Sequence, residues 1–262
     1  VIHNSSYLFK FLKFIEFDDV GEIVEHFGAK YSFIIKLGTN CLLELIRETL
    51  SFASLESLLD RHVVGKIMLV LNIGVLDDDA KEQIDLDLYE ILIIIAKKLK
   101  NKTFAIKEHY LQEYICEEVV YSSLLHQLAA KRDATNVLLR LLVFLYDMIG
   151  FKTFRDEMET RALMPALIKL LMHYQKNVER KSMLLEVSTN VLHLSLATLD
   201  AMLNKASNKR QSVGFFKDVK GVEFILSLFR RNSDDKVRAF VLQMLMSLKM
   251  KDAPVLVDVD KD

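Results

Sequence analysis

The chain has 262 residues, of which 51% are hydrophobic, and a net charge of -1. This apolar content supplies a large core and excludes disorder as the main state, and the near-neutral charge gives no general attraction for nucleic acid or anionic lipid. Only 2 prolines and 8 glycines are present, too few for the turns of an all-β sandwich, so the composition predicts an all-α fold.

The N-terminal third begins with an aromatic-rich stretch, YLFKFLKFIEF, which runs from Tyr7 to Phe17. Helical spacing places its aromatic side chains on two faces, and such a helix would aggregate if both faces were exposed. Three alternatives stay open: the helix is sandwiched in an array, it packs on a preceding repeat, or it forms a partner surface. Residues 34–50 then predict a helix or a helix pair, with a break at Gly38.

Two later segments have the periodicity of helices. Leu88, Leu92, Ile95 and Leu99 recur at helical spacing before a basic last turn, which predicts an amphipathic helix over residues 85–100. An apolar series over residues 179–204 covers more than one face, so we expect a long helix packed between neighbours. Polar segments at 101–103, 204–212 and 232–235 predict short connections.

The dipeptide Thr-Asn precedes a leucine-rich run three times, at residues 39–40, 135–136 and 189–190. Recurrent N-capping explains the first two copies, because a short polar side chain accepts a bond from an unpaired backbone N–H. The third copy falls inside the expected long helix. A chance match in a leucine-rich chain is the other explanation.

The C-terminal half contains two segments with the same order of elements. They begin with Phe154-Arg155-Asp156 and Phe216-Lys217-Asp218, and each continues through a turn into an apolar helix, over residues 164–171 or 221–229. A polar gap and a second long helix follow in both. A short, a middle and a long helix in about 40 to 60 residues is the period of helical-repeat arrays. Pro165 suits the first turn of its helix.

Residues 162–171, ALMPALIKLL, resemble the second helix of armadillo repeats, with Ala162 in the place of the usual glycine. The resemblance is clearer over residues 117–250 than over residues 1–100. It implies a right-handed superhelix of armadillo-like repeats, in one domain over residues 1–252, followed by an acidic flexible tail over residues 253–262. It also implies a scaffold or adaptor that binds a peptide or helix of a partner protein along a concave groove.

The long third helices of such repeats line the groove, so their polar or unusual side chains mark the expected recognition surface. The candidates are Glu44, Arg47, Arg140, Tyr146, Asp147, His193, Thr198, Gln243 and Ser247. Tyr146 is the candidate aromatic anchor. The family's groove-facing asparagine is replaced by Asp147, Thr198 and Ser247, so we do not expect an asparagine ladder. The alternative is that the candidates form only the solvated side of amphipathic helices.

No catalytic or cofactor motif is present, since the sequence lacks GxxxxGK[ST], GxSxG, HExxH and CxxC. Glu22 and His26 would supply two ligands where a zinc site needs three or four, and Asp77-Asp78-Asp79 lacks the rest of a calcium loop and predicts a charged helix start. We therefore expect no enzyme activity, cofactor or metal. A regulatory domain for a folded client (kinase, GTPase or chaperone) is the alternative function, and a helical enzyme with an unrecognised site is a remote one.

The two cysteines, Cys41 and Cys116, lie in apolar contexts and are expected to be small core residues in a reducing compartment. Apolar runs are interrupted well before the length of a membrane span. These features favour a cytoplasmic location, with the nucleus as the alternative.

A basic segment, with Lys205, Lys209 and Arg210, lies near Arg230 and Arg231 in the expected last repeat. These side chains form either an edge that binds acidic peptide or phosphate, or solubilising loop positions. Acidic residues nearby in the sequence offset their field.

Overall fold

The computed structural model describes residues 32–33, 35–44, 46–47, 52–60, 62–72, 78–100, 115, 117–160, 162–179, 185–232 and 234–248. Across these ranges the regular structure is helical and no strand occurs, which confirms the predicted all-α class. The aromatic stretch at 7–17, the Glu22 and His26 pair, Cys116 and the tail at 253–262 lie outside these ranges.

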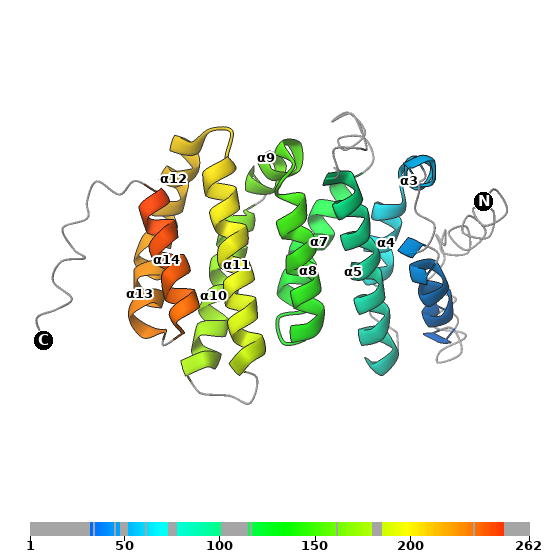
Figure 1. Ribbon diagram of the computed structural model, residues 1–262, viewed down its shortest axis with the longest axis horizontal. Helices are drawn as coiled ribbons and strands as arrows, with labels where there is room; N and C mark the ends of the chain where they lie inside the picture. Colours follow the sequence, from blue (N-terminus) through cyan, green and yellow to red (C-terminus); the bar gives the residue numbers. More distant parts are fainter. Residues whose placement is uncertain are drawn as a thin grey trace, which may run out of the picture.

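Eleven helices have defined bounds, and residues 35–44 are helical as well. They are α3 (Phe52–Leu59), α4 (Val63–Leu71), α5 (Asp78–Lys100), α7 (Glu118–Ala130), α8 (Thr135–Met148), α9 (Lys152–Thr160), α10 (Leu163–Glu179), α11 (Leu185–Lys205), α12 (Lys209–Asp218), α13 (Gly221–Arg231) and α14 (Asp235–Ser247). The helices form an elongated row with α3 near one end and α13 and α14 at the other (Figure 1).

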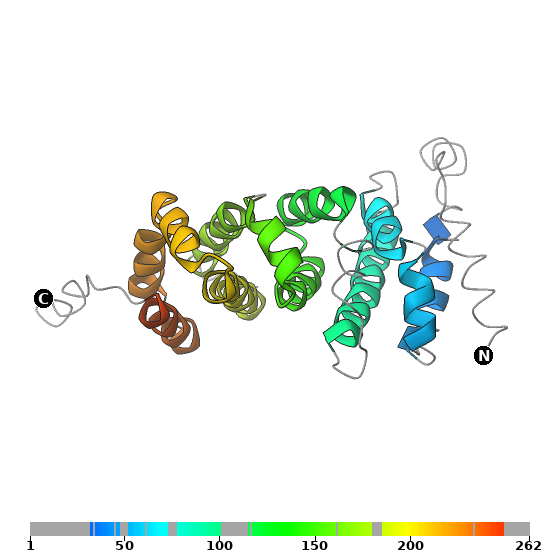
Figure 2. The same ribbon diagram turned by 90° about the horizontal axis from the view of Figure 1, so that it is seen from above.

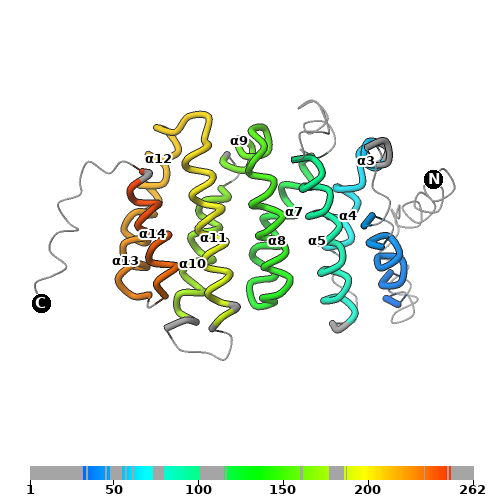
Figure 3. Tube along the Cα trace, viewed as in Figure 1, coloured from blue at the N-terminus to red at the C-terminus, as the bar shows by residue number. Residues whose placement is uncertain are grey.

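The helices fall into three sets by position. We call α5, α8, α11 and α14 the long-helix layer, and α4, α7, α10 and α13 the middle-helix layer; successive members of each layer pack on one another. The two layers are visible as two rows from above (Figure 2). The chain trace shows the long helices running in one direction and the short helices α3, α9 and α12 at the edge where they end (Figure 3).

The hydrophobic core lies between these layers. Leu88, Leu92, Ile95 and Leu99 of α5 are all buried, as their spacing predicts, and lysines occupy the last turn of α5. Because each helix buries apolar residues against both layers, the core continues from one group of helices to the next.

The same tight corner precedes three of the four middle helices. His62, Ala162 and Lys220 each have a left-handed backbone, with φ of 55°, 65° and 57°. In each corner the residue's N–H donates to the carbonyl three residues earlier, and its carbonyl accepts from the N–H four residues later. Only glycine adopts this conformation without steric cost, so Ala162 occupies a position whose backbone favours glycine.

These corners correct the register of the two C-terminal segments. Phe154 lies eight residues before Ala162, whereas Phe216 lies four residues before Lys220. The residue equivalent to Phe216 is therefore Met158, and both side chains are fully buried. The order of helices predicted from the sequence holds, but the two Phe-basic-Asp motifs are offset by one helical turn and do not correspond.

The burial pattern of α8 recurs in α11, 54 residues later in the chain. Every residue of α8 that is buried between positions 137 and 148 has a buried counterpart 54 residues further along the chain. Thr135-Asn136 and Thr189-Asn190 are 54 residues apart as well, so they occupy equivalent positions. With an offset of 46 residues, from Val191 and Val237 onward, α14 repeats this pattern in part: Val237, Val241, Met244, Leu245 and Leu248 are buried, whereas Arg238 and Leu242 are exposed where α11 has the buried Leu192 and Leu196.

The N-capping explanation of Thr-Asn is wrong. Ala134 is the N-cap of α8 and no side chain caps this helix. Thr39 is buried inside a helix that includes Gly38, so the predicted break at Gly38 is wrong too. Asn136 is exposed in the first turn of α8, and Asn190 is exposed in the second turn of α11. The long helix predicted over residues 179–204 begins later than expected, at Leu185, and Glu179 is the last residue of α10.

Two burial predictions also need correction. Helical spacing predicts that Leu242 is a core residue, but it is 37% exposed, because no helix among the described residues covers that side of α14. Cys41 is exposed. Helical spacing predicts further core positions in the C-terminal half, and all six are buried: Leu167, Leu170, Leu171, Ile225, Leu228 and Leu245. Pro165 lies in the first turn of α10, as expected.

Candidate binding surface

The predicted recognition residues lie on the long-helix layer and on the helical segment before α3. Helix α8 carries Arg140, Tyr146 and Asp147, α11 carries His193 and Thr198, and α14 carries Gln243 and Ser247, while Glu44 and Arg47 lie at 44 and 47. The side chain of Ser247 lies outside the described part of the structure. The remaining candidates differ in exposure, and their contacts decide which of them can meet a partner.

Three candidates on α8 contact two residues of α5. Arg140 forms an ion pair with Glu90. Lys100 places its Nζ 2.5 Å from Oδ1 of Asp147 and 5.6 Å from the centre of the Tyr146 ring. Sequence periodicity does not identify Glu90 and Lys100, because they belong to a different helix far upstream in the chain.

These contacts leave Arg140 and Tyr146 open to solvent. The Arg140 side chain is 48% exposed and Tyr146 is 41% exposed. Asp147 is largely buried and its carboxylate neutralises Lys100. Asp147 therefore positions Lys100 beside the tyrosine ring and offers little surface of its own.

On α11, one candidate is exposed and one is not. The ring of His193 meets that of Phe240 on α14 edge to face, with the centroids 5.2 Å apart. Thr198 is fully buried, and its hydroxyl donates to the Leu194 carbonyl at 2.8 Å. Because it is buried, Thr198 cannot contact a partner. A threonine can lie within an apolar helix face in this way because its hydroxyl bonds a carbonyl of the preceding turn. Gln243 on α14 is exposed.

Glu44 and Arg47 form an exposed ion pair at 2.8 Å. They lie close enough to α5 to influence Asp87, a buried carboxyl group. Burial raises the pKa of Asp87, and a hydrogen bond from Gln83 and the charge of Arg47 oppose the rise. This pair therefore belongs to the junction between residues 35–47 and α5.

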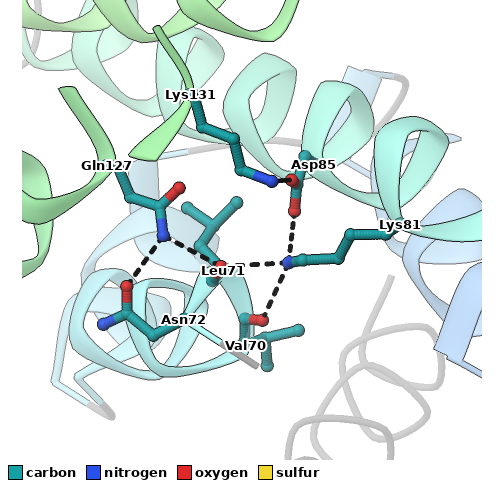
Figure 4. Close-up of polar contacts among 7 residues, drawn as sticks. All are labelled: Val70, Leu71, Asn72, Lys81, Asp85, Gln127 and Lys131. Carbon is teal, nitrogen blue, oxygen red and sulfur yellow. Dashed lines mark hydrogen bonds and ion pairs between the residues drawn. The ribbon is translucent and has the colours of Figure 1, made fainter. Parts of the chain in front are cut away.

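A second polar cluster lies at the junction of α4, α5 and α7 (Figure 4). Asp85 is fully buried; Lys81 places its Nζ 2.6 Å from one carboxylate oxygen, and Lys131 places its Nζ 2.7 Å from the other. Lys81 also donates to the Leu71 carbonyl at 3.0 Å, where the C-terminus of α4 favours a cation. Burial lowers the pKa of Lys81, and Asp85 opposes this effect.

The amide of Gln127 extends this cluster (Figure 4). Its Nε2 donates to the Leu71 carbonyl at 3.0 Å and to Oδ1 of Asn72 at 2.8 Å, and Asn72 donates to Ser123 at 2.7 Å. Asp85 and Gln127 are buried and the charged groups of the cluster bond one another, so the cluster fastens α4 and α5 to α7. It offers no binding site.

Among the described residues, no group of three or more His, Cys, Asp or Glu side chains is placed to hold a metal ion. No helix in the described ranges is long and apolar enough to cross a membrane. No model of a protein family, no curated protein and no solved structure matches this chain.

The repeat register adds one surface residue that helical spacing alone did not indicate. Met246 on α14 occupies the position of Tyr146 on α8, after offsets of 54 and 46 residues, and it is 79% exposed. The candidate surface therefore consists of Arg140, Tyr146, His193, Gln243 and Met246. We call these five residues the long-helix surface.

Proposed function

We propose that the chain is an armadillo-like superhelix that serves as a non-enzymatic interaction scaffold. It binds an extended peptide or a helix of a partner protein along the long-helix surface. One observation carries this proposal: exposed side chains of several chemical kinds lie on three successive parallel helices, α8, α11 and α14. A surface that repeats along an array can contact successive residues of one elongated partner without a catalytic group.

The side chains of this surface suit a peptide with both apolar and acidic residues. Tyr146 and Met246 offer aromatic and thioether contacts, of the kind that dominate peptide-binding surfaces. Arg140 can donate to a carboxylate or a backbone carbonyl. Gln243 can both donate and accept.

Three of these side chains are held in place before any partner arrives. Glu90 and Lys100 contact Arg140 and Tyr146, and Phe240 supports His193. Side chains that are already ordered lose less rotamer entropy on binding, which favours affinity.

The test begins with selection of peptides from a displayed library on the intact chain, followed by measurement of their Kd. We expect the double variant Arg140→Glu, Tyr146→Ala to bind a selected peptide at least about tenfold more weakly, which corresponds to about 1.4 kcal/mol. The matched control is Lys169→Glu, Met172→Ala on α10. Its residues are exposed, Met172 by 45%, but they belong to the middle-helix layer.

Equal loss in both double variants would contradict the assignment of the surface. So would unchanged affinity in the Arg140→Glu, Tyr146→Ala variant with its helix content preserved. Far-UV circular dichroism of each variant provides the check on folding.

A further inference from the structure

The last long helix has a charged residue where the earlier ones have leucine. Arg238 on α14 occupies the position of Leu192 on α11 and of Leu138 on α8. Both leucines are fully buried, whereas the Arg238 side chain is 45% exposed. An inner position of the array has thus become an outer one.

A second position on α14 shows the same change. Leu242 is equivalent to Leu196 on α11 and Leu142 on α8. The two earlier leucines are fully buried and Leu242 is 37% exposed. On α8 and α11 the equivalent side faces the next long helix. The side of α14 that carries Arg238 and Leu242 is therefore the side on which a following helix would pack.

The last middle helix continues this face. Leu226 and Phe229 on α13 are equivalent to Ile168 and Leu171 on α10, which are buried, but are themselves only half-buried. The guanidinium of Arg238 lies 4.9 Å from the centre of the Phe229 ring. We define Leu226, Phe229, Arg238 and Leu242 as the end face.

The chemistry of the end face limits what can cover it. The guanidinium of Arg238 lies 4.0 Å from Oδ1 of Asp235, whose side chain is 97% exposed. This long, solvated contact would compensate the charge poorly if an apolar helix buried Arg238, and burying a poorly compensated charge is costly. A covering segment therefore needs apolar side chains for Phe229 and Leu242 and a carboxylate for Arg238. A bidentate pair between a carboxylate and arginine would satisfy the guanidinium.

We propose that the end face binds residues 253–262 of the same chain as an intramolecular cap. This segment joins an apolar run, APVLV at 253–257, to the carboxylates Asp258, Asp260 and Asp262. It begins five residues after Leu248, which follows directly on the helix that carries Arg238 and Leu242. At roughly 3.3 Å per extended residue, the intervening chain is long enough to reach both α13 and α14.

Charge also favours this occupant. Arg230 and Arg231 end α13 beside the face, and both are exposed. Together with Lys236 and Arg238 they outnumber the neighbouring Asp234 and Asp235, so the net charge beside the end face is positive. Its attraction for the three carboxylates is strongest at low ionic strength.

The test uses the absence of tryptophan from the chain. A Leu256→Trp variant of the full chain carries a single fluorescent reporter within the proposed cap. We expect its emission to be blue-shifted relative to a synthetic peptide of residues 249–262 with the same substitution. Adding Arg238→Glu or Leu242→Asp should move the emission to that of the free peptide.

The matched control is Lys236→Glu, the same charge change in the same turn of α14, on an exposed residue outside the end face. An acidic residue in this first turn suits the helix dipole, so neither charge reversal should unfold α14. Emission that already equals that of the free peptide, or that ignores both end-face variants, overturns the proposal. A blue shift that disappears on dilution overturns it as well, because a second copy would then supply the segment.

Discussion

Lys131, which directly follows the last residue of α7, places its Nζ 2.7 Å from Oδ2 of Asp85 on α5. The carboxylate of Asp85 has no exposed surface. The ion pair thus joins the adjacent helices α4 and α5 to the next pair in the chain, α7 and α8. Lys81 shares the same carboxylate and also contacts the end of α4. The cluster thus ties together both layers of the array.

Replacing Asp85 should strongly destabilise the fold. In Asp85→Asn two largely buried lysines lose their counter-ion, and breaking a buried pair in this way costs about 3 kcal/mol or more. The free energy of unfolding in urea measures the loss. Glu44→Ala, which breaks the exposed pair with Arg47, serves as the control and should cost about 0.5 kcal/mol or less. Equal costs would show that the ion pairs of Asp85 do not hold α5 to α4 and α7.

The two leucines Leu167 and Leu242 should differ in their response to truncation. Leu167 is fully buried and Leu242 is 37% exposed. We expect Leu167→Ala to cost about 2 to 5 kcal/mol, because it leaves a cavity between packed helices. Leu242→Ala should cost about 1 kcal/mol or less, since surface changes remove little packing. Thermal melts of the two variants, compared directly, will show whether α14 is the outer helix of the array.

Helical periodicity predicted the apolar faces of α5 and α10 well, because that signal is local. It cannot show whether a neighbour covers a face, so it predicts a core position for Leu242, which is exposed in the structure. The same limit applied to Thr198, whose hydroxyl bonds the preceding turn of its own helix. A polar residue type therefore did not identify an exposed position.

Local sequence patterns could not identify the residues of α5 that contact the candidate surface on α8. Glu90 and Lys100 are brought to α8 only when α5 and α8 pack in parallel. The left-handed corners at His62 and Lys220 carried no sequence signal, since glycine is the usual marker of that conformation. The corners define which residues of successive helices are equivalent, and this register is a property of the folded chain that local sequence patterns do not carry.

Glycine at the Ala162 corner should stabilise the protein. Ala162 has φ of 65°, a conformation that costs an L-residue about 1 kcal/mol or more. Glycine removes this cost but increases the entropy of the unfolded chain, so we expect a net gain of about 0.5 to 1 kcal/mol for Ala162→Gly. The control is Ala166→Gly within α10, which should cost about 1 kcal/mol. A loss of stability in Ala162→Gly would contradict the strained corner.

Alanine at Gly221 should destabilise the last corner. A Cβ at this position would overlap the ring of Phe216, which is fully buried and cannot move away without repacking. We expect Gly221→Ala to cost about 1 to 3 kcal/mol, despite the better helix propensity of alanine. Phe216→Leu in the same chain should recover part of that cost, whereas additive losses in the double variant would locate the strain elsewhere.

Tyr174 should make the fold less stable as the solution becomes strongly alkaline. Burial raises the pKa of Tyr174 to about 12, and the Asp133 carboxylate adds to the rise. Its hydroxyl donates to the Arg132 carbonyl at 2.7 Å. The unfolded chain loses this proton from its ordinary pKa of about 10, while the folded chain keeps it until about 12.

The stabilising contribution of Tyr174 is therefore complete below pH 10 and declines as the pH rises from about 10 to about 12. Tyr174→Phe removes this titration, so the free energy of unfolding should fall less steeply over that interval in the variant than in the unaltered chain. Denaturant titrations at pH about 9 and about 11 measure the two slopes. Tyrosinate absorbance gives an independent check, because the folded chain and Tyr174→Phe should titrate alike below pH about 11 and differ by one tyrosine only after unfolding. Identical slopes would contradict the buried contact between the Tyr174 hydroxyl and the Arg132 carbonyl. So would a folded variant that titrates one tyrosine fewer than the folded unaltered chain near pH 10.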